Sequence, residues 1–261
     1  MKEFEEKYVV VLGGSSGLGM ATAKKLAQHG MNIIIVHRTR RSDMPEVEKN
    51  FEEIEKAGVE LHHFNVDATK PEKRDEVVLS LKKNLGKGKL HGLLHSIAKG
   101  NLKPMVSKDA QVLKHDDFML TIDAMGASLF DWVKELHLAA LFAADARVIA
   151  FTSEGSHRAI ENYAAVSAAK ATLEAITRSI ALEYAPFGIK ANCIQAGVTD
   201  TSSLRLIPGS ELLIAQSLKR NPNKRLTMPE DVANAVYLLC KKEAAWINGT
   251  VIPVDGGEHI R

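Results

Sequence analysis

The stretch Tyr8-Val9-Val10-Val11-Leu12-Gly13-Gly14-Ser15-Ser16-Gly17-Leu18-Gly19 decides the fold. Its first five residues form a short apolar, β-rich run, which is typical of a strand buried on both faces of a parallel sheet. A glycine-rich turn follows, and residues 20–29 then have the pattern of a helix that ends at Gly30. A strand, a glycine loop and a helix in this order direct free backbone N–H groups and a helix dipole toward a pyrophosphate. We therefore expect phosphate groups to bind at Gly13, Ser15, Ser16, Gly17, Leu18 and Gly19.

The next apolar run, residues 32–36, predicts a second strand, and the residues that follow it bear on the nucleotide. An acidic side chain here would accept hydrogen bonds from an adenosine ribose, but His37-Arg38-Thr39-Arg40-Arg41 contains none. Arg38 can instead offer a positive charge and a planar fork of donors to a 2′-phosphate. A basic turn exposed to solvent is the alternative, and it fits Arg40 and Arg41 better than Arg38. The sequence thus favours NADPH over NADH.

Strand and helix patterns alternate through the rest of the chain without a break in composition. Strands are predicted at residues 59–66, 90–97, 147–152, 189–195 and 250–254, and helices at 45–57, 121–143, 163–184 and 229–241, with a further basic helix that ends at Asn84. This order predicts one doubly wound α/β domain over residues 1–261, of the Rossmann type, with a seven-stranded parallel sheet. Ligands bind at the carboxyl ends of such strands, which is where the sequence places Gly13, Arg38, Asp67, Ser96, Ser153 and Val198.

Residues 199–228 interrupt the regular pattern with an irregular, amphipathic segment. A long insertion at the carboxyl edge of a parallel sheet is usually a lid over the ligand, so we expect a substrate lid here. The segment is also basic, since it carries Arg205, Lys219, Arg220, Lys224 and Arg225.

Tyr163 and Lys170 form a candidate chemical pair at the start of a long run of helix formers. They are seven positions apart, so they lie about 20° from each other on one helix face. The lysine can place its charge near the phenol and lower the cost of phenolate character, or it can reach a sugar hydroxyl. The phenol can deliver a proton or hold a developing oxyanion. A core tyrosine beside a solvated lysine is the structural alternative.

Composition and charge exclude several classes of function. Of the 261 residues, 45% are apolar and 25% charged, and the net charge of +2 gives no case for a nucleic-acid binder. No apolar run reaches membrane-spanning length, and the charged N-terminal residues do not form a signal peptide. Cys193 and Cys240 lie in apolar stretches that suit reduced thiols in the cytoplasm, and the histidines at 62, 63, 91 and 95 lack metal-ligand spacing. We expect a cytoplasmic protein with no metal site.

The chain resembles the short-chain dehydrogenase/reductase family over nearly all its length. The resemblance rests on Gly13-x3-Gly17-x-Gly19, Asp67, the Tyr163/Lys170 pair, Gly197-x3-Thr201 and Val254-Asp255-Gly256-Gly257. Most members of the family have three residues between the tyrosine and the lysine. The six residues found here are similar to the spacing in bacterial enoyl-acyl-carrier-protein reductases. His95-Ser96-Ile97-Ala98, Ala196-Gly197 and the residues after Lys170 point the same way.

Two positions depart from the family pattern. Many enoyl reductases carry a second tyrosine ten residues before the first, where this chain has Ser153. The serine is similar to an NADPH-using branch of enoyl reductases that also lacks that tyrosine, and equally to the serine of carbonyl reductases. Asp123 stands where many members have a structural asparagine, which puts a proton relay through that site in doubt.

The resemblance implies hydride transfer from NADPH to the β-carbon of a trans-2-enoyl thioester in fatty-acid synthesis. Tyr163 would hold the enolate oxygen, Lys170 would bind the nicotinamide ribose, and Ser153 would be a secondary contact. Val198 and Thr201 would hold the carboxamide. Further contacts with the cofactor are implied for Asp67, Ala68, Ser96, Ile97, Ala98 and Thr199.

Two other functions fit parts of the sequence. A carbonyl reductase acting on a 3-oxoacyl thioester would use the same fold, because both reactions need hydride delivery and an oxyanion partner. A nucleotide-binding regulator without catalysis would have no need of the phenol, so the intact Tyr163/Lys170 pair argues against it.

Two expectations concern partners. The basic residues of the predicted lid would dock an acidic acyl carrier protein, with a solvated lid helix as the alternative. The apolar load of the helices near 121–143 and 162–184, together with the habit of the family, predicts a homotetramer.

Overall fold

The computed structural model describes residues 2–207 and 209–261, so Met1 of the charged N-terminus and Pro208 of the predicted lid lie outside the described residues. Its centre is a seven-stranded sheet in the order β3-β2-β1-β4-β5-β6-β7, and all neighbouring strands are parallel. The strands are β1 (Tyr8–Leu12), β2 (Asn32–His37), β3 (Leu61–Asn65), β4 (Leu90–His95), β5 (Phe142–Ser153), β6 (Ile189–Ala196) and β7 (Val251–Val254). The predicted fold class, a single α/β domain with this parallel sheet, is confirmed.

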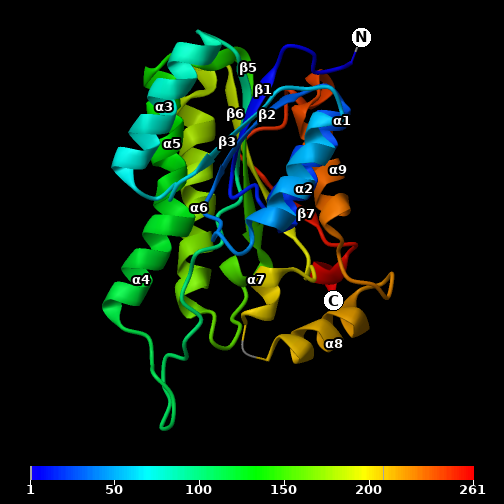
Figure 1. The fold of residues 1–261 in the computed structure, drawn as a ribbon. Coiled ribbons are helices and arrows are strands. Elements are labelled where there is room, and N and C mark those ends of the chain that lie inside the picture. The colour runs from blue at the N-terminus through cyan, green and yellow to red at the C-terminus, as the bar shows by residue number, and fades with distance from the viewer. Residues whose placement is uncertain (1, 208) are drawn as a thin grey trace.

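Helices cover both faces of the sheet (Figure 1). One layer holds α1 (Gly17–Gln28), α2 (Met44–Glu55) and α9 (Pro229–Cys240), and the other holds α3 (Pro71–Leu85), α5 (Ser128–Leu138) and α6 (Ala164–Glu183). The chain returns to the sheet after each helix, which is the connection that parallel strands require.

Alternation along the strands builds the two cores. In β1, Val10 and Leu12 pack into the core with α5 and α6, while Val9 and Val11 pack into the core with α1 and α9. All four side chains are at most 2% exposed. A strand buried on both faces is therefore apolar at every position, which explains the continuous apolar run from which the fold was predicted.

The helix predicted over residues 121–143 is wrong in its extent. The structure has α4 (His115–Ile122), a π-helical turn (Asp123–Ala127) and α5, and β5 already begins at Phe142. Gly126 lets this turn pack closely against α6, because a Cβ there would lie 3.1 Å from the carbonyl oxygen of Ala169. The chain turns at Ala140, whose φ of 55° is left-handed, and that turn ends the helix.

The predicted lid contains two helices, α7 (Ser202–Arg205) and α8 (Ser210–Arg220), beyond the carboxyl edge of the sheet (Figure 1). Between α8 and α9, residues 221–228 return the chain to the domain. Among the described residues, no helix is both long enough and apolar enough to cross a membrane.

Candidate active site

One cavity of about 470 Å³ opens at the carboxyl ends of the strands. It brings together residues from the ends of β2, β5 and β6, from the loops that follow β1, β3 and β4, from α6 and from the predicted lid. Every residue predicted for the site lines this cavity except Gly19. These lining residues are Gly13, Ser15, Ser16, Gly17, Leu18, Arg38, Asp67, Ala68, Ser96, Ile97, Ala98, Ser153, Tyr163, Lys170, Val198, Thr199 and Thr201.

The glycine loop joins β1 to α1 at the floor of the cavity. Gly13 has a φ of +79°, and a Cβ there would lie 2.4 Å from the carbonyl oxygen of Ser96 at the end of β4. Gly17 has a φ of +54°, and a Cβ there would meet only Thr201, at 3.6 Å. The loop thus presents its backbone to the cavity at the N-terminus of α1, which suits a pyrophosphate.

Gly19, which was also predicted to bind the cofactor, is the one predicted site residue that does not line the cavity. It is buried, and a Cβ at this position would lie 2.5 Å from the carbonyl oxygen of Gly13. Gly19 therefore lets the first turn of α1 pack behind the loop, and it does not reach the cavity. The helix also begins at Gly17, three residues before the predicted start, so the loop is shorter than the sequence pattern suggested.

Arg38, Asp67 and Lys99 form a charged cluster where β2, β3 and β4 end. Arg38 Nη1 lies 3.2 Å and Lys99 Nζ 3.0 Å from the same oxygen, Oδ2 of Asp67. The other carboxylate oxygen accepts hydrogen bonds from the backbone N–H and hydroxyl of Thr69. Although partial burial opposes the charge, the bonds from Thr69 and Lys99 hold the pKa of Asp67 well below its usual range. The side chain of Arg38 is 63% exposed and lines the cavity, so its guanidinium can reach a phosphate there.

Tyr163 is the residue before the first turn of α6, and its hydroxyl lies 3.5 Å from Oγ of Ser153 at the end of β5. The absence of a side chain at Gly155 makes room for the ring, since a Cβ there would lie 2.6 Å from Cε1 of Tyr163. Burial raises the pKa of the Tyr163 phenol, and the bond with Ser153 lowers it in part. The phenol is therefore a proton or hydrogen-bond donor at neutral pH.

Lys170 lies two turns further along α6, on the same wall of the cavity. Its Nζ donates a hydrogen bond of 2.6 Å to the carbonyl oxygen of Phe151, and burial lowers its pKa to about 8. Burial is the main cause of the raised pKa of Tyr163, and Lys170 is not among the groups that shift it. This geometry is compatible with a ribose hydroxyl of the cofactor lying between Lys170 and Tyr163.

His91 and His95 are buried side chains with structural partners. His95 Nε2 lies 2.8 Å from Oγ of Ser128, and burial together with the charge of Lys170 lowers its pKa to about 3. His91 Nε2 lies 3.0 Å from the carbonyl oxygen of Cys240. In the described ranges, no three histidine, cysteine, aspartate or glutamate side chains come close enough to hold a metal ion.

Asp123 does not contribute to the cavity. Its side chain is exposed at the start of the π-helical turn, whereas Met125 from the same turn lines the cavity wall. A proton relay through Asp123, which the resemblance already put in doubt, therefore has no support in this geometry.

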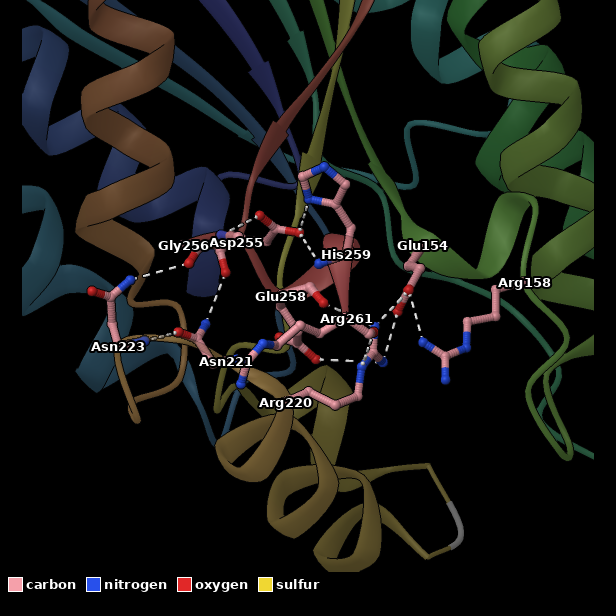
Figure 2. Close-up of polar contacts among 11 residues, drawn as sticks. Glu154, Arg158, Arg220, Asn221, Asn223, Asp255, Gly256, Glu258, His259 and Arg261 are labelled. Carbon is pink, nitrogen blue, oxygen red and sulfur yellow. Dashed lines mark hydrogen bonds and ion pairs between the residues drawn. The ribbon is translucent and has the colours of Figure 1, made fainter.

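Three of the five basic residues of the lid are already bound to carboxylates. Arg205 contacts Asp200, and Arg225 contacts Asp231, each through two hydrogen bonds. Arg220 turns inward, as Figure 2 shows, and contacts Glu154 at 2.7 Å. The predicted cluster of free basic residues is thus reduced to Lys219 and Lys224, and Lys224 donates to the carbonyl oxygen of Lys219.

The structure adds lining residues that sequence reasoning missed. Lys99 follows β4, and Asp255 and Glu258 follow β7. The rule that ligands bind at the carboxyl ends of strands could have found these three. It could not have found the apolar residues brought in by loops and the lid, which are Leu102, Ile160, Leu206, Ile207 and Leu213.

Comparisons with known proteins place the chain among oxidoreductases of this fold. A sequence profile of the family described as Enoyl-(Acyl carrier protein) reductase matches residues 13–259. The NADPH-dependent enoyl-acyl-carrier-protein reductase FabI of Staphylococcus aureus is 28% identical over 263 residues, which cover 99% of each chain. Cis-4-hydroxycyclohexanecarboxylate dehydrogenase of Sinomonas cyclohexanicum is also 28% identical, over 97% of each chain.

A solved structure agrees with the sequence matches. The crystal structure of enoyl-acyl-carrier-protein reductase (NADH) from Aquifex aeolicus superposes with a TM-score of 0.80 at 25% identity. The superposition covers 99% of this chain and 98% of the other.

Proposed function

Since the chain belongs to the enoyl-(acyl carrier protein) reductase family of short-chain dehydrogenase/reductases, we propose that it reduces the double bond of a trans-2-enoyl thioester with NADPH. The observation that carries the proposal is the placement of Tyr163, Ser153 and Lys170 on one cavity wall, with the glycine loop in the same cavity. Relatives named as enoyl-acyl-carrier-protein reductases support the reaction, and a related dehydrogenase of a hydroxy acid shows why it needs a test.

The cofactor fits the residues that are present. The backbone of the glycine loop is open at Gly17, where an added Cβ would meet only a methyl-bearing side chain at 3.6 Å, so the pyrophosphate would bind there. Lys170 would bind the nicotinamide ribose, and Val198 and Thr201 the carboxamide. When bound, the cofactor supplies a hydride, and the protein supplies orientation and charge placement.

The raised pKa of Tyr163 defines its role. A phenol that stays protonated can donate a hydrogen bond to the thioester oxygen as negative charge develops there. Ser153, 3.5 Å away, keeps the hydroxyl oriented and can make a second contact with the substrate. Lys170 adds a buried positive charge two turns along the helix, and that charge also favours an enolate over a neutral thioester.

The spacing of the pair favours C=C over C=O reduction. In carbonyl reduction the tyrosine must contact the oxygen on the carbon that receives hydride. In enoyl reduction the oxygen is two carbons further away. Tyr163 and Lys170 are seven positions apart instead of four. This places the lysine about 4.5 Å further along the helix, which suits the longer acceptor.

Carbonyl reduction remains the second candidate, because the contact between Ser153 and Tyr163 is also what a 3-oxoacyl reductase would use. The deciding experiment compares NADPH oxidation with trans-2-hexenoyl-coenzyme A and 3-oxohexanoyl-coenzyme A, in the wild type and in Tyr163→Phe. We expect turnover of the enoyl substrate and a loss of at least about a hundredfold in kcat for the variant. Turnover of the 3-oxo substrate alone would overturn the reaction assignment and leave the cofactor assignment in place.

We infer NADPH as the preferred cofactor from Arg38 and from the lack of an acidic residue after β2. Relatives named for each cofactor exist, so the family by itself does not decide. The exposed guanidinium of Arg38 at the cavity supports a 2′-phosphate partner.

We also propose that the natural substrate is carried by an acyl carrier protein and that the enzyme is a homotetramer. Lys219 in the last turn of α8 and Lys224 in the connection after it support docking of an acidic carrier. The alternative is that both lysines are simply solvated. Large apolar side chains that stay exposed on α4, α5 and α6 support assembly, and they are Met119, Leu120, Phe130, Leu138 and Leu182.

A further inference from the structure

Glu258 is a buried carboxyl group that the active site described so far does not use. It begins a short 3₁₀ turn (Glu258–Ile260) after β7, and it is 3% exposed. It nevertheless lines the cavity. Among the described residues, neither of its carboxyl oxygens has a hydrogen-bond partner. A desolvated acceptor without a partner is costly, so its presence in a cavity points to a ligand that completes it.

Arg220 lies near Glu258 but does not donate a hydrogen bond to its carboxyl group. Its Nε donates to the carbonyl oxygen of Arg261, and its two terminal nitrogens donate to the carboxylate of Glu154 (Figure 2). A further bond goes to the backbone carbonyl of Glu258 itself, at 3.1 Å. The side-chain oxygen of Glu258 lies 3.8 Å from Nη1, which is too long for a hydrogen bond.

Asp255 gives the contrast within the same segment. It also lines the cavity, but its two oxygens accept from the backbone N–H groups of Gly257 and His259 and from the ring of His259. Asp255 is therefore a structural carboxylate, whereas Glu258 has only a long ion pair with Arg220, at 3.8 Å, and no hydrogen bond to its carboxyl oxygens among the described residues.

Arg220 links Glu258 to the segment that holds Ser153, at the reacting end of the proposed substrate. Glu154 follows Ser153 directly, and one guanidinium, that of Arg220, lies between Glu154 and Glu258. An alkyl chain has no donor for Glu258, and packing one there would leave the carboxyl group unpaired. The arm of a thioester has amide N–H groups and hydroxyls that can donate to it.

We propose that Glu258 is a substrate-binding residue that accepts a hydrogen bond from an amide N–H or hydroxyl of the pantetheine arm. The inference rests on the proposed function, because it takes a pantetheine thioester as the ligand. It assigns the arm to the side of the cavity near the C-terminal segment, and the acyl chain to the apolar lining elsewhere.

The test measures binding of unreactive thioesters to the NADP⁺ complex by calorimetry. Hexanoyl-coenzyme A carries the donors of the arm, whereas S-ethyl thiohexanoate has the same acyl chain without them. We expect Glu258→Leu to weaken hexanoyl-coenzyme A about tenfold or more and to leave the S-ethyl ester within about twofold. Glu258→Gln, which keeps one acceptor, should retain part of the affinity. Glu48→Leu, at an exposed site on α2, is the control for loss of a carboxylate.

Other outcomes overturn the proposal. If Glu258 only supports Arg220, Glu258→Leu lowers the melting temperature and weakens both ligands equally. If the donor belongs to the acyl chain, S-ethyl 6-hydroxythiohexanoate binds better than the plain ester, and Glu258→Leu removes that gain alone. If a water molecule completes the carboxyl group, affinity for both ligands stays unchanged.

The proposed reaction is tested separately. Binding of hexanoyl-coenzyme A without turnover of trans-2-hexenoyl-coenzyme A would reject the proposed reaction. The role of Glu258 would still be decided by the comparison of the two ligands. Turnover with equal ligand affinities in the wild type and Glu258→Leu would reject only the role of Glu258.

Discussion

Replacing Arg38 by alanine should convert a preference for NADPH into near indifference between the two cofactors. In the structure the Arg38 side chain is 63% exposed, and its Nη1 lies 3.2 Å from a carboxylate oxygen of Asp67. A 2′-phosphate would give Arg38 a stronger partner, because the phosphate carries more charge and accepts the planar fork. NADH lacks that phosphate, so its binding should not depend on Arg38.

The magnitude follows from two contributions. The hydrogen bond between Arg38 and the charged phosphate contributes about 1.5–3 kcal/mol. Binding breaks the exposed Arg38–Asp67 ion pair, which costs about 0–1 kcal/mol. Lys99 stays 3.0 Å from the same oxygen of Asp67, so the carboxylate is not left unpaired when Arg38 moves. The net of about 1–2 kcal/mol corresponds to a loss of roughly 5- to 30-fold in kcat/KM for NADPH.

The assay is initial-rate kinetics with each cofactor at a fixed enoyl thioester concentration, for the wild type, Arg38→Ala and Arg41→Ala. Arg41 lies in the same basic segment, is exposed and does not line the cavity, so its replacement is the matched control. We expect the ratio of kcat/KM values to change only in Arg38→Ala. Equal use of NADH by the wild type, or the same change in both variants, would refute the reasoning.

Three further predictions concern the lysine, the lid and the assembly. Burial lowers the pKa of Lys170 from 10.5 to about 8, so its burial destabilises the fold most below pH 8 and not at all above pH 10.5. The free energy of unfolding of Lys170→Met, relative to wild type, should therefore fall by about 3 kcal/mol across that range in urea titrations, and a flat difference would contradict this. Lys219→Glu should raise KM for a carrier-bound substrate several-fold at low salt and spare a coenzyme A thioester, whereas equal effects on both would reject carrier docking. Light scattering at micromolar concentration should give a tetramer, and Leu182→Glu should shift it toward smaller species; a wild-type monomer would reject the assembly.

Much of the fold could be predicted from local sequence. Most strands contain a short apolar run that stops at a glycine, a polar residue or a charged residue, and these signals depend only on near neighbours. The position of the cavity followed as well, because the rule about carboxyl ends needs only the order of strands and helices. Ser153 and Arg38 were found this way, and each lines the cavity.

Where sequence reasoning failed, a distant contact decided the outcome. The π-helical turn at Asp123–Ala127 depends on how closely Gly126 approaches α6, a contact between residues more than 40 positions apart. The strand β5 begins at Phe142 because it pairs with β4 at Leu90, although residues 139–143 have good helix formers. Local propensity is a small free energy, and tertiary packing outweighs it.

The sequence by itself determined the parallel sheet, the glycine loop and the tyrosine–lysine pair, because periodicity and spacing within one helix or strand are local properties. Only the tertiary structure decided which charges are free. Arg220 looked like a surface cation of the lid, yet it contacts Glu154, 66 positions earlier, and Glu258 lies against the cavity with no hydrogen-bond partner in the described chain. The free energy of a charge depends on burial and on neighbours brought together by folding, and neither is written in the residues beside it.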